Sequence, residues 1–264
     1  MDAGAFVYPL VASIVFLTTV FFIARYKDRY DLVDAAWGMT FIGIALVSYT
    51  GQKDLQLFSV QTLVLVLVAI WGLRLAYHIY HRWEYSEYED KRYQNLRNQY
   101  KLLPGGLGIN MYVRVFLVQA ILAFVVCLPV IILNMAHALQ FSWLSILGLL
   151  VWSIGFCFES VGDAQLAKYL HETKGKNKLM TTGLWKYTRH PNYFGEVSQW
   201  WGIFIIVLAM PYWWIAIIGP VAITVLIFSV SGVPLTEKHF EGRPGWDKYV
   251  RQTSKFLPLP PKKG

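Results

Sequence analysis

The chain has 264 residues, of which 56% are hydrophobic and only 15% are charged, and its mean hydropathy is +0.41. This composition excludes a disordered chain and argues against a soluble domain, because long apolar runs are typical of helices that cross a membrane. The net charge of +8 needs no nucleic acid to explain it, since basic loops on one side of a membrane produce the same excess. We therefore expect an integral membrane protein.

Seven apolar segments are long enough, or nearly so, to cross a bilayer, which takes about 20 helical residues. They lie near 6–24, 32–49, 59–80, 112–133, 143–161, 194–210 and 212–231, and the sixth is the shortest. The two cysteines, Cys127 and Cys157, lie within apolar runs and lack metal-ligand spacing. Buried thiols are therefore expected, and no metal site.

The basic residues show which way the chain crosses the membrane. Nearly all of the 24 Lys and Arg lie in the first, third and fifth connections and in the C-terminal tail, whereas the opposite loops hold only Lys53. The positive-inside rule then predicts an N-terminus outside and a cytoplasmic C-terminus. The expected fold is all-α: one polytopic membrane domain over 1–264 with seven transmembrane helices, and with its motif-bearing core at about 112–261.

The most informative stretch is GLWKYTRHPNYFGEVSQWW, at 183–201. Its first half is a cationic, aromatic loop, and Pro191 suits the first turn of a helix. Asn192, Glu196 and Gln199 follow at i, i+4 and i+7, so they share one face of that helix. Because polar groups in an apolar span are costly unless they serve a function, this stripe is a candidate site.

Acidic residues occur in two other apolar segments. Asp31 stands where the second helix begins and is expected to cap it, whereas Asp34 lies one turn deeper and is expected to face a partner or a cavity. Glu159 and Asp163 share a face of the fifth helix at i, i+4. Two carboxylates so close repel each other unless a cation or a hydroxyl lies between them, and a ribose or Lys168 would meet that need.

Basic and aromatic residues share a face of the third helix. Arg74, Tyr77, His78 and His81 follow one another at helical spacing, and Arg74 is deep enough to need a buried acidic or phosphate partner. The chain has no glycine-rich dinucleotide fingerprint after a strand and no Walker loop. Helix ends and side chains must therefore hold any nucleotide.

Five stretches together resemble one known family. GLWKYTRHPNYFGE, EDKRYQNLR, YDLVDAAWG, WGLRLAYH and YVRQTSKFLPLPPK are similar to the bacterial membrane relatives of steroid 5-alpha-reductases, and the resemblance spans almost the whole chain. It implies a seven-helix fold with a cytoplasmic-side cavity for NADPH. It also implies transfer of hydride to the carbon–carbon double bond of an enone-bearing lipid.

The resemblance assigns roles at the reacting centre. Asn192 and Glu196 match residues that contact the nicotinamide end of NADPH, and Asp163 matches one that helps to hold the cofactor. Asp34 matches, loosely, an acid that polarises the substrate carbonyl. The tyrosine that assists this acid belongs in the third helix, where Trp71 or Tyr77 occupies the place. Asp34, Glu196 and Tyr77 are thus the expected catalytic residues.

Further residues are expected along the cofactor. Planar Arg side chains suit phosphate, so arginines and a histidine are expected to neutralise the phosphates, while carboxylates bind hydroxyls and tyrosines pack alongside. The expected cofactor-binding set is Arg74, Arg92, Glu159, Asp163, Tyr187, Arg189, His190, Asn192, Tyr193, Glu196 and Tyr249.

Two alternatives stay open. The core from Arg189 to Gly195 also resembles membrane methyltransferases that act on isoprenylcysteine or phospholipid and use S-adenosylmethionine. Those enzymes follow the core with an Arg and paired Glu residues, whereas LTEKHF here has the single Glu237. The other alternative is a non-enzymatic membrane or transport protein. The expected partners are a lipophilic substrate and membrane lipid, in a bacterial inner membrane or, for a eukaryotic source, the endoplasmic reticulum.

Overall fold

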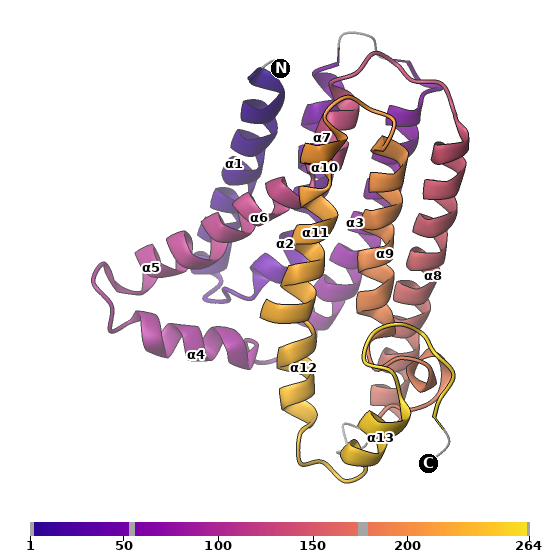
Figure 1. Cartoon of the computed structure of the whole chain (residues 1–264). Helices are drawn as coiled ribbons and strands as arrows, with labels where there is room; N and C mark the ends of the chain where they lie inside the picture. The colour runs from indigo at the N-terminus through magenta and orange to yellow at the C-terminus, as the bar shows by residue number, and fades with distance from the viewer. Residues whose placement is uncertain (1–2, 53–55, 174–178, 263–264) are drawn as a thin grey trace. The chain divides into compact units, whose positions relative to one another are not determined.

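The computed structural model describes residues 3–52, 56–173 and 179–262 (Figure 1). Within these ranges the chain is helical and has no strand; a single β-bridge joins Thr188 to Ser254. The all-α prediction is therefore confirmed. Lys53, Lys174, Lys176, Lys178 and Lys263, which contribute to the loop-charge pattern, lie outside the described residues.

Six helices in the described ranges are long and apolar enough to cross a membrane, the pattern of an integral multi-pass membrane protein. They are Gly4–Tyr26, Leu32–Thr50, Val60–Glu84, Gly106–Val126, Trp143–Glu172 and Trp213–Phe240. The remaining expected span is α9 (Pro191–Val207), which has only 17 residues. A count of seven and the orientation stay predictions.

Contacts divide the chain into two compact units, which are described separately; a single domain stays a prediction. Unit 1 comprises Met1–Phe141 and Met210–Ile218. Its helices are α1 (Gly4–Tyr26), α2 (Leu32–Thr50), α3 (Val60–Glu84), α4 (Lys91–Tyr100), α5 (Gly106–Met111), π-helical η1 (Tyr112–Leu117), α6 (Val118–Val126), α7 (Leu128–Asn134) and α10 (Trp213–Ala216). Side chains of α1, α2, α4, η1 and α6 share one apolar core, which includes Phe21, Tyr93 and Phe116.

Unit 1 departs from the predicted elements in two places. The fourth span begins earlier than expected, at Gly106, and is interrupted at Cys127, after which Pro129 occupies the first turn of α7. Proline suits that first turn because it needs no hydrogen bond there. The charged third connection is not simply a loop, since Asp90 caps α4 by accepting a hydrogen bond from Arg92 N at 2.8 Å.

Unit 2 comprises Ser142–Ala209 and Gly219–Gly264. Its helices are α8 (Trp143–Glu172), 3-10 helical η2 (Gly183–Lys186), α9 (Pro191–Val207), α11 (Ile218–Val225, which begins one residue before the unit), π-helical η3 (Leu226–Val230), α12 (Val233–Phe240) and α13 (Trp246–Gln252). α9 begins at Pro191, as predicted, and α8 continues well beyond the expected end at residue 161. Cys157 on α8 is exposed, so the expectation of a buried thiol is wrong there; Cys127 is buried.

Glycines bring α8 and α9 into backbone contact along most of their length (Figure 1). Gly148 and Gly155 on α8 are seven residues apart, as are Gly195 and Gly202 on α9. A Cβ atom at Gly155 would lie 2.6 Å from the carbonyl oxygen of Gly195, and one at Gly202 would lie 2.7 Å from that of Gly148. Small residues at an interface allow this approach in apolar surroundings. We call these four residues the glycine seam.

Candidate functional site

Polar side chains of unit 2 meet directly across the glycine seam. Gln199 Nε2 on α9 donates a short hydrogen bond to Glu159 Oε2 on α8, and Asn192 Nδ2 donates to Asp163 Oδ1 at 3.1 Å. We call these four residues the amide–carboxylate stripe. The sequence predicted that Asn192 and Gln199 share one face of α9 and that Glu159 and Asp163 share one face of the other helix. The structure shows that these two faces oppose each other.

The amides of the stripe have unused hydrogen-bonding capacity. Within the described chain, Gln199 Oε1 and Asn192 Oδ1 are buried and have no hydrogen-bond partner. Gln199 is only 1% exposed, so bulk water does not satisfy its oxygen. A buried acceptor without a donor is costly, and each such case calls for an explanation. An amide or hydroxyl group of a ligand would supply the missing donor.

Lys168 does not separate Glu159 from Asp163, contrary to one expectation. Its ammonium lies 3.8 Å from Glu172, and both side chains are exposed. The amides of α9 take that place instead. An amide donates to a carboxylate without adding charge, so the stripe stays formally acidic.

The loop before α9 is tied to the C-terminal tail. Arg189 N donates to Ser254 O at 2.9 Å, and Leu259 N donates to Tyr187 O at 3.1 Å. Thr188 Oγ1 also donates to Phe256 O at 2.8 Å. The tail therefore packs along the loop as an extended strap.

The Arg189 guanidinium connects the loop before α9 to α12 and to the C-terminal tail. Its Nε donates to Glu237 Oε1 at 2.9 Å, its Nη2 lies 2.7 Å from the same oxygen, and its Nη1 donates to Thr253 O at 2.7 Å. The residue is 7% exposed. These contacts use the planar fork inside the protein, so Arg189 anchors α12 and the tail to the loop.

His190 is buried beside the same carboxylate. Its Nε2 lies 3.3 Å from Glu237 Oε1, and its ring stacks on Tyr193 with centroids 5.5 Å apart. Burial lowers the pKa of His190 to about 4, although Glu237 opposes that change. The imidazole is therefore neutral at pH 7 and is unsuited to neutralising a phosphate.

The remaining residues of unit 2 that were expected to bind the cofactor differ in whether a ligand could reach their side chains. Tyr249 donates its hydroxyl to Trp185 O at 2.6 Å, and burial raises the pKa of that hydroxyl. Tyr193 OH lies 3.2 Å from Thr236 Oγ1. Tyr187 is exposed, and Glu196 is half-buried one turn beyond Asn192. Tyr249 is thus structural here, whereas Tyr187 and Glu196 are accessible.

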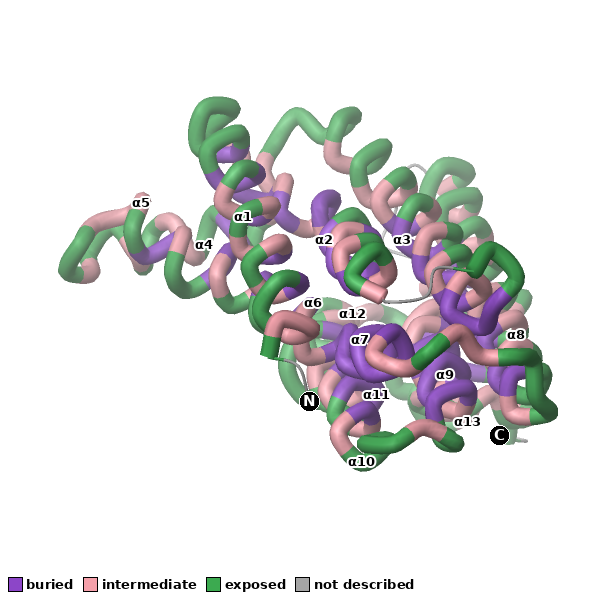
Figure 2. The backbone as a smooth tube through the Cα atoms, turned by 90° about the horizontal axis from the view of Figure 1, so that it is seen from above, coloured by how far each residue is buried: buried purple, intermediate pink, exposed green. Residues whose placement is uncertain are grey.

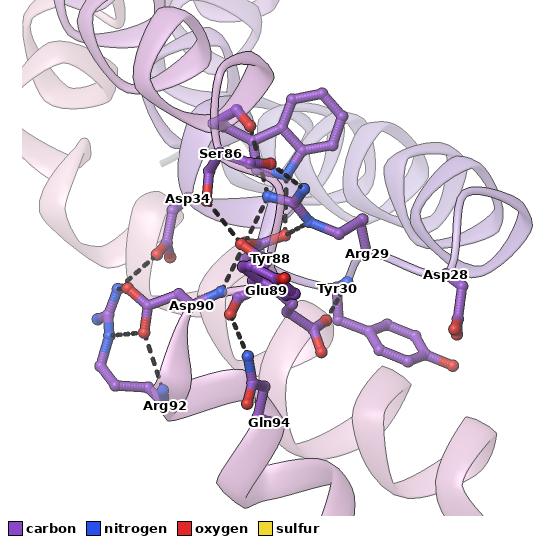
Figure 3. Close-up of polar contacts among 12 residues, drawn as sticks. Asp28, Arg29, Tyr30, Asp34, Ser86, Tyr88, Glu89, Asp90, Arg92 and Gln94 are labelled. Atoms are coloured by element: carbon purple, nitrogen blue, oxygen red, sulfur yellow. Dashed lines mark hydrogen bonds and ion pairs between the residues drawn. The ribbon is translucent and has the colours of Figure 1, made fainter.

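Unit 1 contains a second polar group, around Asp34 (Figure 3). Tyr93 OH donates to Asp34 Oδ1 at 2.6 Å, and Arg92 Nη2 donates to Asp34 Oδ2 at 2.8 Å. Burial, followed by the nearby Asp34 charge, raises the pKa of Tyr93 well above its usual value. Tyr93 therefore stays protonated as a donor.

Arg92 also binds Asp90, so it lies between two carboxylates. Partial burial alone would raise the pKa of Asp90, but the hydrogen bonds from Arg92 hold it below its usual value. Burial lowers the pKa of Arg92, but Asp34 and Asp90 reverse this and raise it overall. The Arg92 side chain is 46% exposed, so it can exchange partners at low cost.

Asp31 holds neighbouring loops together and does not cap α2 with its side chain, contrary to expectation. Its carboxylate accepts from Arg29 Nε at 3.0 Å, Trp83 Nε1 at 2.8 Å and Asp90 N at 2.9 Å. Figure 3 labels Arg29 and Asp90, two of these partners, in the same view as Asp34 and Arg92. With so many donors already bound, Asp31 is a structural anchor.

Two predicted residues of α3 lie apart from the Asp34 hydrogen bonds. Tyr77 is 70% exposed, and its ring centroid is 5.8 Å from that of His81. Arg74 is half-buried. The tyrosine that contacts Asp34 is Tyr93 of α4. Within the described residues no group of three or more potential metal ligands is found.

Sequence reasoning missed Tyr93 and the role of Glu237. Tyr93 belongs to the EDKRYQNLR motif and is the buried residue of an otherwise polar helix, so its isolation in a polar stretch was an available signal. Glu237 is 48 positions from Arg189, and no local pattern joins the two. The expected site residues fall in both units, and the contacts above are those within each unit.

The comparisons with known proteins give one match. Residues 20–253 match the family described as protein of unknown function (DUF1295). No curated protein and no solved structure matches the chain.

Proposed function

Starting from a chain that belongs to the DUF1295 family, we propose that this protein is an NADPH-dependent membrane reductase that transfers hydride to the carbon–carbon double bond of an enone-type lipid. Four of the five stretches that resemble the relatives of steroid 5-alpha-reductases lie wholly within the matched residues 20–253. The family match and the resemblance therefore concern the same part of the chain.

The amide–carboxylate stripe is the observation that carries the proposal. A nicotinamide ends in a carboxamide, whose N–H groups are donors, and each ribose carries hydroxyl donors. Gln199 Oε1 and Asn192 Oδ1 are buried acceptors that lack a donor in the described chain, and Asp163 and Glu159 are buried carboxylates beside them. The donor-rich end of NADPH thus fits the stripe, with Glu196 at its accessible edge.

Fewer of the residues expected to bind the phosphates of NADPH are available to do so. Arg189 is committed to Glu237 and the tail, and His190 is neutral, so we assign both to positioning the loop. Arg92 is half-exposed and able to change partners, and Arg74 stays a candidate on α3. Bound NADPH supplies the hydride, and the protein supplies orientation and a dry environment.

We assign the substrate carbonyl to unit 1. Tyr93 is held by Asp34 at 2.6 Å and keeps its proton. The hydroxyl has a single proton, so it would donate to a carbonyl oxygen, and stabilise the negative charge that develops on that oxygen during reduction, by exchanging Asp34 for the substrate. Arg92 would still hold Asp34, which is not itself the donor because both of its oxygens accept hydrogen bonds.

One observation favours a second candidate, a methyltransferase that uses S-adenosylmethionine. Arg189 is the only Lys or Arg that is buried in the described part of the chain, and Glu237 neutralises it. The buried groups of unit 2 therefore suit a ligand with cationic ammonium and sulfonium groups better than a polyanion. Glu237 also lies against the core that resembles those enzymes.

Ligand-induced stabilisation separates the candidates. The detergent-purified protein is heated with NADPH, NADH or S-adenosylmethionine, each alone; a ligand at 100 times its dissociation constant adds about 2.7 kcal/mol to the native state. The reductase predicts a raised melting temperature with NADPH. A shift with S-adenosylmethionine alone would establish the second candidate, and no shift with any ligand would favour a non-enzymatic protein.

A further inference from the structure

A cavity of about 400 Å³ lies within unit 1, at the C-terminal ends of α2 and α7 and the first turns of α1. Pro211 and Tyr212, which precede α10, complete its lining. The cavity and Asp34 are at opposite ends of α2, about 20 Å apart at 1.5 Å per residue. It is therefore separate from the Asp34 network of unit 1. Figure 2 looks down on this end and shows α7 as buried throughout.

The cavity wall combines apolar side chains with a chain of neutral polar groups. Ile131 and Ile132 of α7 are buried beside it. Gln52 Nε2 donates to Asn134 Oδ1 at 3.0 Å, and Asn134 Nδ2 donates to Ser48 Oγ at 3.2 Å. This chain runs from half-buried Gln52 to buried Ser48. Each amide has two N–H groups and an oxygen, so both retain capacity for a ligand. Apolar walls with a few placed polar groups are typical of small-molecule sites.

The described lining of the cavity has no permanently charged side chain, and His137 contributes an imidazole. None of the described residues that line it is Asp, Glu, Lys or Arg. A phosphate, carboxylate or ammonium group would lose its hydration there without gaining an opposite charge, which is unfavourable. The lining therefore selects a neutral ligand that carries hydroxyl groups.

Two tyrosines at the mouth indicate where the ligand comes from. Tyr8 and Tyr212 line the cavity and are exposed. Tyrosine gathers at the membrane–water interface, where its ring is apolar and its hydroxyl hydrated. Tyr212 also has a φ of 67°, which is strained for a bulky residue; such strain concentrates at ligand clamps. A ligand at this depth comes from the lipid interface.

We propose that this cavity binds the head of a neutral, hydroxyl-bearing lipid of the monoacylglycerol class. Its glycerol hydroxyls would exchange hydrogen bonds with Gln52 and Asn134, and the first carbons of its acyl chain would cover Ile131 and Ile132. The inference does not depend on the proposed reductase activity, because no residue of that machinery lines the cavity.

Photo-crosslinking tests the proposal on the full-length protein in detergent. The probe is a monoacylglycerol with a diazirine near the head, and labelled peptides are mapped. We expect labelling on α7 and the C-terminal end of α2, with competition by monoolein but not by oleate or methyl oleate. Equal competition by methyl oleate would show simple apolar partition, and stronger competition by oleate would show an anion site. Either result would overturn the proposal.

Variants sharpen the result. Ala136→Trp fills the cavity and should abolish the mapped labelling, whereas Ile121→Trp, at an exposed position on α6, should leave it unchanged. Gln52→Leu keeps the side-chain volume but removes a hydrogen-bonding group, so the probe should bind about 5-fold more weakly. If Ala136→Trp does not fold, binding of the probe to Gln52→Leu still tests the proposal. Labelling that neither folded variant reduces would contradict the site.

Discussion

The stripe of unit 2 and the Asp34 network of unit 1 use carboxylates in different ways. In unit 2, Glu159 and Asp163 are buried and paired with neutral amides. In unit 1, Asp34 is paired with a half-exposed arginine and a tyrosine. An amide that donates to a carboxylate still has an oxygen to offer, whereas an arginine offers only donors. The stripe can therefore receive a ligand's N–H or O–H groups, while the network mainly fixes loops and a single hydroxyl.

The largest effect should come from the glycine seam. Gly195→Ala places a Cβ against Gly155 O and Glu159 N, and backbone atoms cannot move aside easily. We expect a loss of about 3 kcal/mol or more, or failure to fold. Gly43→Ala on α2 is the matched control, because nothing lies within 4 Å of its added Cβ. It should be neutral or stabilising by up to about 1 kcal/mol. Thermal unfolding in detergent measures both; equal effects would contradict the seam.

Breaking the buried ion pair should cost nearly as much. Arg189→Ala leaves Glu237 without its main partner and unties the tail from the loop, so a loss of about 3–5 kcal/mol is expected. Asp28→Ala removes a partner of Arg97 whose side chain is 83% exposed. Such surface pairs contribute about 0–1 kcal/mol. Should Arg189→Ala melt like the wild type, Arg189 would be free for a ligand, as the sequence alone suggested.

His190 gives unit 2 a pH dependence. Its native pKa of about 4 lies below the unfolded value of about 6.5. Between these pH values the unfolded state binds more protons than the native state. The stabilisation that His190 contributes is therefore fully present above about pH 6.5 and is lost as the pH falls toward 4. The total loss is on the order of 3 kcal/mol. The contribution of His190 is measured as the difference in unfolding free energy between the wild type and His190→Asn. A difference that does not change from pH 7 to 4 would contradict the lowered pKa of His190.

The smallest effect concerns the hydroxyl in unit 1. Tyr93→Phe removes the donor at 2.6 Å from Asp34 and should cost about 1–3 kcal/mol, since the half-buried acceptor loses a partner. Tyr77→Phe alters an exposed hydroxyl and should change nothing measurable. Under the proposed function, Tyr93→Phe also lowers the rate of enone reduction and Tyr77→Phe does not. The reverse order of the two rates would restore Tyr77 as the assisting tyrosine.

The sequence predicts local features of this chain well. Hydropathy gives the apolar helices, Pro191 gives the start of α9, and helical spacing places Glu159 with Asp163 and Asn192 with Gln199. Each of these depends on neighbours within two turns.

Features that depend on distant residues were not predicted. The seam pairs glycines of two different helices, and Arg189 forms an ion pair with Glu237 on another helix. Asp31 accepts hydrogen bonds from Trp83 and Asp90 instead of capping α2. The heptad spacing of the glycines was visible, but the spacing alone does not say which helix packs against which. Tyr93 was quoted within a motif, yet its burial follows from the apolar core that it shares with residues of α1, α2, η1 and α6.

The central claim is that the stripe holds the nicotinamide end of NADPH, and a pair of matched variants tests it most directly. Gln199 and Gln61 are both 1% exposed, but Gln61 belongs to α3 of unit 1 and forms hydrogen bonds to His137 O and from Leu139 N. NADPH affinity is measured by titration for the wild type, Gln199→Leu and Gln61→Leu, each checked for folding. We predict about 5–10-fold weaker binding for Gln199→Leu and wild-type affinity for Gln61→Leu. Unchanged affinity in Gln199→Leu, or binding of S-adenosylmethionine in place of NADPH, would contradict the account.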